Sequence, residues 1–400
     1  MRALALMVAG AVLFSAMPAV AGVEELTAGG RFMWDVTVWS GVEQEQDGAW
    51  DGVEFPNGTE TRRARVFLKG KAYENLRFKV VYDFSGGDEI SLKDAYLDIV
   101  GVPGVGNVRV GQFLEPFCFN ELTSSKYISF IERASVNVFA PSRNAGLMLH
   151  DSFAEGKLSY QAGLFLDTGN MADKSGDEDY SFAGRVTSLV MGEEKSDTLI
   201  HLGGALNYFV PGGDVRFRQR PEVHLSDRLV DTGVIMNADG VFRYGVELAA
   251  VFGPLYLAGE YAATSVSKTD EDVPVARADT WLSEDSSFSG FYAEAGYFLT
   301  GEHRSYKGGL WDRTKPMSNF LDGGGLGAWE VAARYSSLDL NDDNADVFGG
   351  KMDNVTLGLN WYLHSNARLM FNYVMSSVKD SIDDELGSAN AFTMRTQIDF

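Results

Sequence analysis

The carboxy-terminal segment 391–400 alternates strictly between two kinds of side chain. Apolar or small residues stand at every second position from Phe392 to Phe400, and polar residues such as Arg395 and Asp399 stand between them. Because successive side chains of a strand point to opposite faces, this pattern predicts a strand with one apolar and one polar face. Such a strand suits a barrel wall between lipid and water, although a soluble sandwich could also use one.

The amino-terminal residues have the features of a secretory signal peptide. Arg2 supplies a positive start, residues 4–14 are apolar, and small residues at 19–21 form a cleavage site. We therefore expect residues 1–21 to be removed and residues 22–400 to form a single β-barrel domain. No later segment reaches the roughly 18 apolar residues that a spanning helix needs.

The alternation of the last strand recurs through most of the chain. It predicts sixteen strands, at 30–40, 60–72, 76–84, 91–100, 106–112, 145–151, 157–167, 180–190, 197–209, 243–252, 255–264, 290–299, 327–337, 353–363, 367–377 and 391–400. Short turns mostly alternate with long connections, as in bacterial outer-membrane barrels, whose strand number is even. We therefore predict an all-β fold, a 16-stranded antiparallel transmembrane barrel with inward-folded loops.

The formal net charge of −22 arises in the connections. Five segments together account for it, at 43–60, 173–179, 270–285, 339–346 and 380–385, and the remainder of the chain is balanced. Acidic outer loops suit a lipopolysaccharide surface bridged by divalent cations, and they equally suit plain solvation. The acidity therefore does not set the sign of a lumen.

Three connections are too long to be simple turns, at 113–144, 210–242 and 300–326. Connections of this length are usually functional or disordered. The alternation of turns puts the first two outside the cell and the third on the periplasmic side. The first connection is rich in Phe and Ile, so we expect it to fold into the barrel and narrow a channel that would otherwise be wide.

Two groups of basic residues could contact an anion. Hydroxyls and cations lie together at 124–126, and such groups can replace part of the hydration shell of an oxyanion, although they are also ordinary in loops. If segment 215–223 is extended, Arg216, Arg218 and Arg220 share one face at a spacing of about 6.6 Å. This row could guide anions or bind lipid phosphates.

Strand 60–72 carries a second basic set. Its alternate small or apolar residues suit lipid or a neighbouring subunit, which points Arg63, Arg65, Lys69 and Lys71 inward. A charge on the lipid face would cost about 2–4 kcal/mol near the bilayer centre, so the inward orientation is favoured.

Over about residues 30–400 the chain resembles the phosphate-selective porins of the O/P type. The stretches that carry the resemblance are 61–65, 93–97, 111–113, 123–126, 132–133, 216–222, 327–336 and 357–363. The resemblance implies a homotrimer of 16-stranded barrels in the bacterial outer membrane, with an arginine ladder that leads to a central anion site. It implies a constriction formed by Asp94, Ser124, Ser125, Lys126 and Arg133. It assigns the ladder to Arg216, Arg218, Arg220, Arg62 and Arg63.

One position departs from the family pattern. Phosphate-specific members have a lysine three residues before the serine pair, whereas this chain has Glu121. A like-charge contact at 4 Å costs on the order of 4 kcal/mol at an effective dielectric constant of about 20, so this carboxylate would oppose a phosphate dianion.

These features favour a passive anion channel, with phosphate or polyphosphate as the anion. The alternative is a general or weakly cation-selective porin, which Glu121 and the acidic loops would suit. The expected partners are inorganic anions, outer-membrane lipid and lipopolysaccharide, with no nucleic acid and no cofactor.

An enzyme is not expected from this sequence. The histidines lack metal-ligand spacing, and the single cysteine, Cys118, excludes an internal disulfide. A lipase-type barrel would need a hydroxyl nucleophile beside a histidine. The nearest pair, Ser196 and His201, would lie on opposite faces of a strand.

Overall fold

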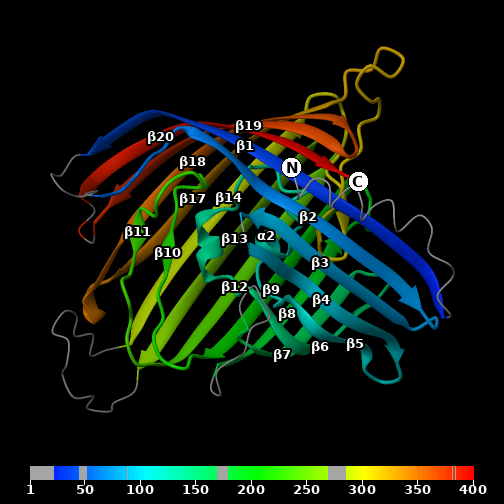
Figure 1. Ribbon diagram of the computed structural model, residues 1–400, viewed down its shortest axis with the longest axis horizontal. Helices are drawn as coiled ribbons and strands as arrows, with labels where there is room; N and C mark the ends of the chain where they lie inside the picture. The colour runs from blue at the N-terminus through cyan, green and yellow to red at the C-terminus, as the bar shows by residue number, and fades with distance from the viewer. Residues whose placement is uncertain are drawn as a thin grey trace.

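A computed structural model describes residues 22–44, 52–87, 89–168, 179–268, 285–380, 382 and 384–400. The expected signal peptide, residues 1–21, lies outside the described residues. Sixteen antiparallel strands form one closed barrel (Figure 1). They are β1 (Val23–Gln44), β2 (Gly58–Ala72), β3 (Leu76–Gly86), β4 (Glu89–Val102), β5 (Gly106–Leu114), β6 (Arg143–Phe153), β7 (Leu158–Leu166), β8 (Tyr180–Met191), β9 (Thr198–Val210), β12 (Ala238–Phe252), β13 (Leu255–Lys268), β14 (Ser286–Phe298), β17 (Ala328–Asp342), β18 (Val347–His364), β19 (Ala367–Lys379) and β20 (Glu385–Asp399).

The barrel closes where the first strand pairs with the last, from Arg31 opposite Asp399 to Gln44 opposite Gly387. Closure leaves no strand edge unpaired, which is what a sheet requires in hydrocarbon, where no water can satisfy backbone polar groups. The alternation of the last strand appears directly in its exposure. Phe392 is 44% exposed on the outer face, whereas Arg395 is fully buried on the inner one.

Each of the sixteen predicted strands is present, and the predicted fold is confirmed. Several strands continue further towards the outer end than the sequence indicates. For example, β17 ends at Asp342 rather than 337, and β18 begins at Val347 rather than 353. These extra residues still pair, as Asn341 does with Phe348. A strand beyond the lipid no longer needs an apolar face, so its alternation weakens although its hydrogen bonds continue.

The three long connections carry short elements of their own. The 115–142 connection contains α2 (Phe119–Leu122) and the 3₁₀ turn η1 (Ser135–Phe139), and the 211–237 connection contains β10 (Arg218–Gln219) and β11 (Val230–Asp231). The 299–327 connection contains β15 (Tyr306–Lys307) and β16 (Leu310–Trp311), and a further 3₁₀ turn, η3, spans Asp343–Ala345. In the described part of the chain, no helix has the length and apolar character that crossing a membrane would require.

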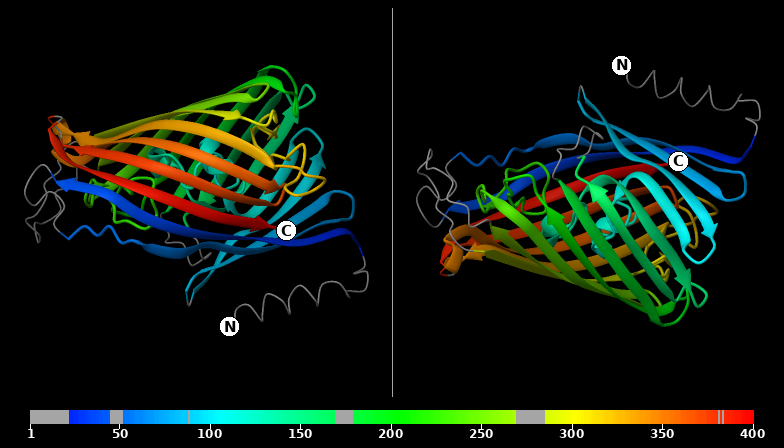
Figure 2. Two further views of the ribbon diagram at one scale, coloured as in Figure 1. Left: turned by 90° about the horizontal axis from the view of Figure 1, so that it is seen from above. Right: turned by 90° about the horizontal axis from the view of Figure 1, so that it is seen from below.

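The 115–142 connection packs against the inward-facing side chains of β12–β20, which we call the packed wall. The amide of Phe119 donates to Glu260 at 2.7 Å, and that of Ile131 donates to Asn372 at 2.8 Å. Buried aromatic residues of the connection, including Phe117 and Phe139, complete a dry core between it and the wall. Figures 1 and 2 show α2 within the outline of the barrel. The open part of the lumen therefore lies on the opposite side, along β1–β6.

Candidate anion pathway

A cavity of about 390 Å³, the central cavity, lies between β1–β6 and the 115–142 connection. Its side along the strands, which we call the basic wall, is dominated by cations from six consecutive strands. The ionisable lining residues are Arg31, Arg62, Arg63, Arg65, Lys79, Lys93, Asp94, Arg109, Glu121, Arg133 and Arg143. Basic residues outnumber acidic ones on this lining, so a small anion would be attracted into it.

A bulge in β2 places two adjacent arginines on the same side of the wall. Met33 pairs with Arg63 and the next residue, Trp34, pairs with Thr61, so that Arg62 is an extra, unpaired residue. In regular pairing, neighbours point to opposite faces, and one of the two guanidinium groups would face lipid. Because of the bulge, both Arg62 and Arg63 line the central cavity.

Most cations of the basic wall are already matched by a carboxylate. Asp94 accepts from Lys79 at 2.6 Å and from Arg143 at 2.7 Å. Arg65 donates to Asp83 at 2.7 Å, and Arg109 donates to Asp98 at 2.9 Å. These pairs hold the side chains in place and lower the net field that an ion would meet.

Glu132, in the 115–142 connection, offsets part of the charge of the arginine pair. It accepts from Arg62 at 2.8 Å, lies 4.0 Å from Arg63, and accepts from Arg395 of the packed wall at 2.9 Å. These guanidinium groups hold the pKa of the Glu132 carboxyl well below its ordinary value, against the opposing effect of burial. The carboxylate therefore remains charged and links the two walls.

Two lining cations have no carboxylate within 4 Å among the described residues, namely Arg31 and Lys93. Arg31 donates instead to the hydroxyl of Ser125 at 2.7 Å and to that of Ser124 at 3.3 Å. Each serine thus uses its oxygen to accept from Arg31, which leaves its own proton for an anion. We call Arg31, Lys93, Ser124 and Ser125 the open cluster.

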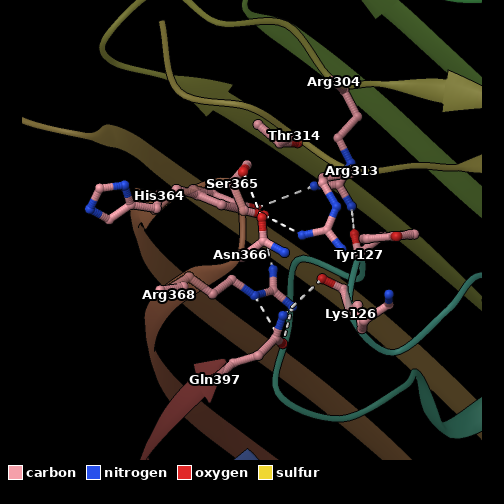
Figure 3. Close-up of a pocket in the computed structure, with 12 residues that line it drawn as sticks. Lys126, Tyr127, Arg304, Arg313, Thr314, His364, Ser365, Asn366, Arg368 and Gln397 are labelled. Atoms are coloured by element: carbon pink, nitrogen blue, oxygen red, sulfur yellow. Dashed lines mark hydrogen bonds between the residues drawn. The ribbon is translucent and has the colours of Figure 1, made fainter. Parts of the chain in front are cut away.

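The predicted constriction residues do not all meet at one place. Ser124, Ser125, Asp94 and Arg133 line the central cavity, but Lys126 does not. It lines a separate hollow with Arg313 and Arg368 (Figure 3). Its Nζ lies 3.5 Å from the carboxylate of Asp399. The backbone turns between Ser125 and Lys126, so neighbours in sequence serve different hollows.

The carboxylate of Glu121 lines the central cavity, but it is not free. It lies 3.0 Å from the guanidinium of Arg133 and accepts from Asn137 at 3.0 Å. Arg133 also donates to three backbone carbonyls at the end of α2, those of Asn120, Glu121 and Thr123. The expected repulsion of an anion by Glu121 is therefore reduced by a bound arginine.

The 211–237 connection places its arginines on the outer side of the central cavity. Arg216 and Arg218 are exposed and flank the buried Phe217, as the expected extended geometry requires. Arg216 donates to Asp231 at 2.6 Å. A fourth arginine, Arg228, joins this group; burial and its neighbours Arg220 and Arg218 lower its pKa.

Arg220 lines a second cavity of about 240 Å³, the outer cavity, together with Arg62, Arg63 and Arg133. The last three residues line the central cavity as well. Of the predicted ladder, Arg220, Arg62 and Arg63 are therefore brought together, and they form a basic path from the 211–237 connection to Arg31. Arg216 lines a further cavity with Arg243 instead, and Arg218 lines neither the outer nor the central cavity.

Sequence reasoning missed Arg31, Lys93 and Arg228. A usable signal existed for Arg31, since it shares one face of β1 with the inward-facing Met33 and Asp35. No comparable signal existed for the pairing of Arg31 with the two serines, which are 93 and 94 residues away. Among the described residues, no three His, Cys, Asp or Glu side chains gather as metal ligands.

Comparison with known proteins identifies the family. A family model described as phosphate-selective porin O and P matches residues 26–400. The chain belongs to this family. Together with the closed barrel, this makes the protein a porin of the bacterial outer membrane, a channel and not an enzyme.

Two proteins resemble this porin in sequence. An uncharacterised protein of Caulobacter vibrioides is 33% identical over 329 residues, which are 79% of this chain and 62% of that protein. The match thus spans less than two thirds of that relative. Porin O of Pseudomonas aeruginosa is 26% identical over 414 residues, with 93% of this chain and 87% of that one covered.

Solved porins share the fold at low sequence identity. The anion-selective porin from Comamonas acidovorans is 15% identical with a TM-score of 0.54, over 94% of this chain and 99% of its own. The DcaP channel of Acinetobacter baumannii is 12% identical with a TM-score of 0.57, over 96% and 99%. A trimer form of OmpT from Vibrio cholerae is 11% identical with a TM-score of 0.58, over 94% and 99%. At these identities the likeness concerns the fold alone.

Proposed function

We propose that this porin is a passive, water-filled channel selective for inorganic oxyanions, with phosphate or polyphosphate as the substrate. The observation that carries the proposal is the open cluster, where Arg31 and Lys93 lack a carboxylate partner among the described residues and Ser124 and Ser125 offer hydroxyl protons. Oxyanions exchange water for such donors readily. The description of the matched family, which names phosphate, supports the same substrate class.

In this proposal the anion meets Arg216 and Arg218 first, passes Arg220 and the shared arginines Arg62 and Arg63, and then reaches the open cluster. The 115–142 connection narrows the pore so that the ion must contact these groups. Conduction requires binding that is strong enough to remove part of the hydration shell and weak enough to release the ion. The carboxylates beside the basic wall supply the second condition, because they offset part of its charge.

Planar-bilayer recording tests the proposal. In a gradient of potassium chloride, the reversal potential is expected to favour chloride over potassium. Phosphate, and separately pyrophosphate, added to one side is expected to reduce the chloride current in a saturable way. A reversal potential that favours potassium, or a chloride current unaffected by either anion, would contradict the proposal.

The second candidate is a general or weakly cation-selective porin, which the carboxylate of Glu121 in the central cavity favours. The salt bridge from Glu121 to Arg133 argues against it. The variants Glu121→Gln and Glu121→Lys separate the two candidates, because both retain a polar side chain of similar length. If the porin is an anion channel whose phosphate affinity Glu121 reduces, that affinity rises in the order wild type, Glu121→Gln, Glu121→Lys. If all three channels prefer potassium, the general porin is the correct assignment.

The assembly and processing of the porin are also proposals. A homotrimer is supported by the trimer form of its structural neighbour OmpT, and removal of residues 1–21 by the signal-like amino-terminus. Acidic outer segments such as 339–346 would meet lipopolysaccharide through divalent cations. Native mass spectrometry of protein purified from outer membranes gives both the subunit number and the mature amino-terminus.

A further inference from the structure

The 299–327 connection, on the periplasmic side of the barrel, divides into two parts with opposite surroundings. Its first part enters the lumen, where Arg304, Tyr306 and Trp311 are each at least 96% buried. Tyr306 contacts His201 on β9 there, with 2.7 Å between the hydroxyl and Nδ1. Its second part, residues 317–326, lies on the outside of the barrel. We call this second part the rim turn.

The contacts of the rim turn establish that it lies outside. The ring of Phe320 packs on the edge of Trp361 with 4.8 Å between centroids, and its amide donates to the carbonyl of Leu363. Trp361 faces outward, because its neighbours in β18, Asn360 and Tyr362, are buried on the inner face. The rim turn therefore covers the outer surface at the periplasmic end of β18.

The rim turn presents large apolar side chains away from the protein. Met317 is 70% exposed, Leu321 75% and Leu326 67%. These fractions exceed those of lipid-facing residues higher on the same wall, such as Val331 at 38% and Leu357 at 49%. Exposed apolar groups gathered in this way mark an interaction surface.

The surface is continuous with the lipid-facing wall through two stacked tryptophans. The rings of Trp329 and Trp361 are parallel within 16°, with 4.9 Å between centroids. Both indole N–H groups donate to the carbonyl of Leu326, at 3.3 and 2.9 Å. Tryptophans of this kind mark the level where a bilayer meets water. The rim turn extends from that level towards the periplasm.

We propose that the rim turn is an interfacial anchor, whose apolar side chains Met317, Leu321 and Leu326 insert into the headgroup region of the periplasmic leaflet. A backbone hydrogen bond from Leu321 to Gly325 closes the turn, so its apolar side chains are presented by a fixed loop. The anchor fixes the outer end of the same connection that places Tyr306 and Trp311 in the lumen. The inference does not depend on which ion the channel carries.

Spin labelling tests this inference in the full-length porin. The native cysteine, Cys118, is buried and is first replaced by Ala. Nitroxides are then attached at Leu321→Cys and, separately, at Leu326→Cys, with Glu155→Cys in the exposed periplasmic turn between β6 and β7 as the control. Each labelled barrel is reconstituted in vesicles of phosphatidylethanolamine and phosphatidylglycerol. Unchanged conductance and heat-modifiable migration confirm that each variant is folded.

Collision rates with oxygen, which concentrates in lipid, and with a water-soluble nickel complex are compared. The inference predicts a ratio of oxygen to nickel collisions several-fold higher at positions 321 and 326 than at 155. A ratio equal to that at 155 would place the turn in water and overturn the inference. Low collision rates with both reagents would indicate a covering protein, such as a second copy of the chain, and would also overturn it.

Discussion

Strands β1–β6 and strands β12–β20 both point arginines and carboxylates into the barrel, but the first group surrounds the central cavity whereas much of the second is covered by the 115–142 connection. On the packed wall, Glu260 and Arg395 hold the 115–142 connection, and each is at least 94% buried. On the basic wall, Arg31 and Lys93 face the central cavity without a carboxylate partner in the described part of the chain. Charged residues of the same types therefore serve structure on one wall and ion attraction on the other.

The comparison explains why charge counts do not describe such a lumen. A buried carboxylate that accepts hydrogen bonds from a loop fixes that loop, and it is shielded from a passing ion by protein. An unpaired cation beside water acts on the ion directly. The relevant quantity is therefore the accessible charge that has no partner.

The largest effect is expected from Glu222→Ala, which removes a carboxylate of the 211–237 connection that contacts the packed wall. Glu222 accepts from the amide of Ser135 at 3.0 Å, from the hydroxyls of Ser336 at 2.6 Å and Thr356 at 3.0 Å, and from Arg334. Removing one partner of a buried ion pair costs about 3–5 kcal/mol. We expect a lower midpoint of urea-induced unfolding in vesicles and larger fluctuations of the channel current, because both long outer connections lose a contact that holds them. Glu54→Ala, at an exposed site, is the control. An unchanged midpoint would contradict this role.

The next largest effect is expected on phosphate binding at the basic wall. Arg31→Gln removes the charge that faces the serine pair while leaving a donor in place. Hydrogen bonds to charged groups contribute about 1.5–3 kcal/mol, so the inhibition constant of phosphate for chloride current should rise about 10- to 100-fold. Arg77→Gln removes an equal charge from an exposed site on β3 and should leave the constant nearly unchanged. Equal effects of the two variants would mean that the open cluster is not the binding site.

A smaller effect should separate paired from unpaired lysines. Lys93→Gln removes an unpaired cation, whereas Lys79→Gln removes a partner of Asp94, which keeps its salt bridge to Arg143. Both variants lose one charge from the same cavity. We expect phosphate affinity to fall several-fold in Lys93→Gln and less in Lys79→Gln, as measured by block of chloride current. The reverse order would refute the distinction between accessible and compensated charge.

The smallest effect is expected from ionic strength. The screening length falls from about 10 Å at 0.1 M to about 3 Å at 1 M salt. The contribution of Arg216 and Arg218, which are exposed at the mouth, should therefore vanish at high salt, whereas that of Arg31 at the contact distance should persist. Selectivity measured at both salt concentrations for Arg216→Gln and Arg31→Gln tests this. A loss of the Arg31 effect at 1 M salt would show that it acts only at long range.

The barrel could be predicted because its signal is local. Each strand must turn one face to lipid and the other to water, so the alternation within about ten residues is sufficient to predict the strand. The outer ends of β17 and β18 escaped prediction for the same reason, since the constraint weakens where both faces are wet. Fold and family could thus be inferred from the residues alone.

The anion site could be predicted only in part, because its geometry depends on contacts between distant segments. Ser124 and Ser125 were found from their chemistry, but the cation that meets them, Arg31, lies on the first strand. Lys126 adjoins the serines in sequence, yet the fold of the 115–142 connection directs it to Asp399. Local patterns identify which residues can bind an anion, and the path of the loop decides which of them do.

The bulge at Arg62 has a consequence for how such channels diverge. Loss of one residue from a strand normally moves every side chain beyond it to the opposite face of the sheet. Here the extra residue, Arg62, is itself a cation. Deleting it would restore the regular pairing of Met33 and Trp34 with β2 and would keep Glu60 on its present face. A deletion at this position would therefore remove one cation from the central cavity without inverting the rest of β2.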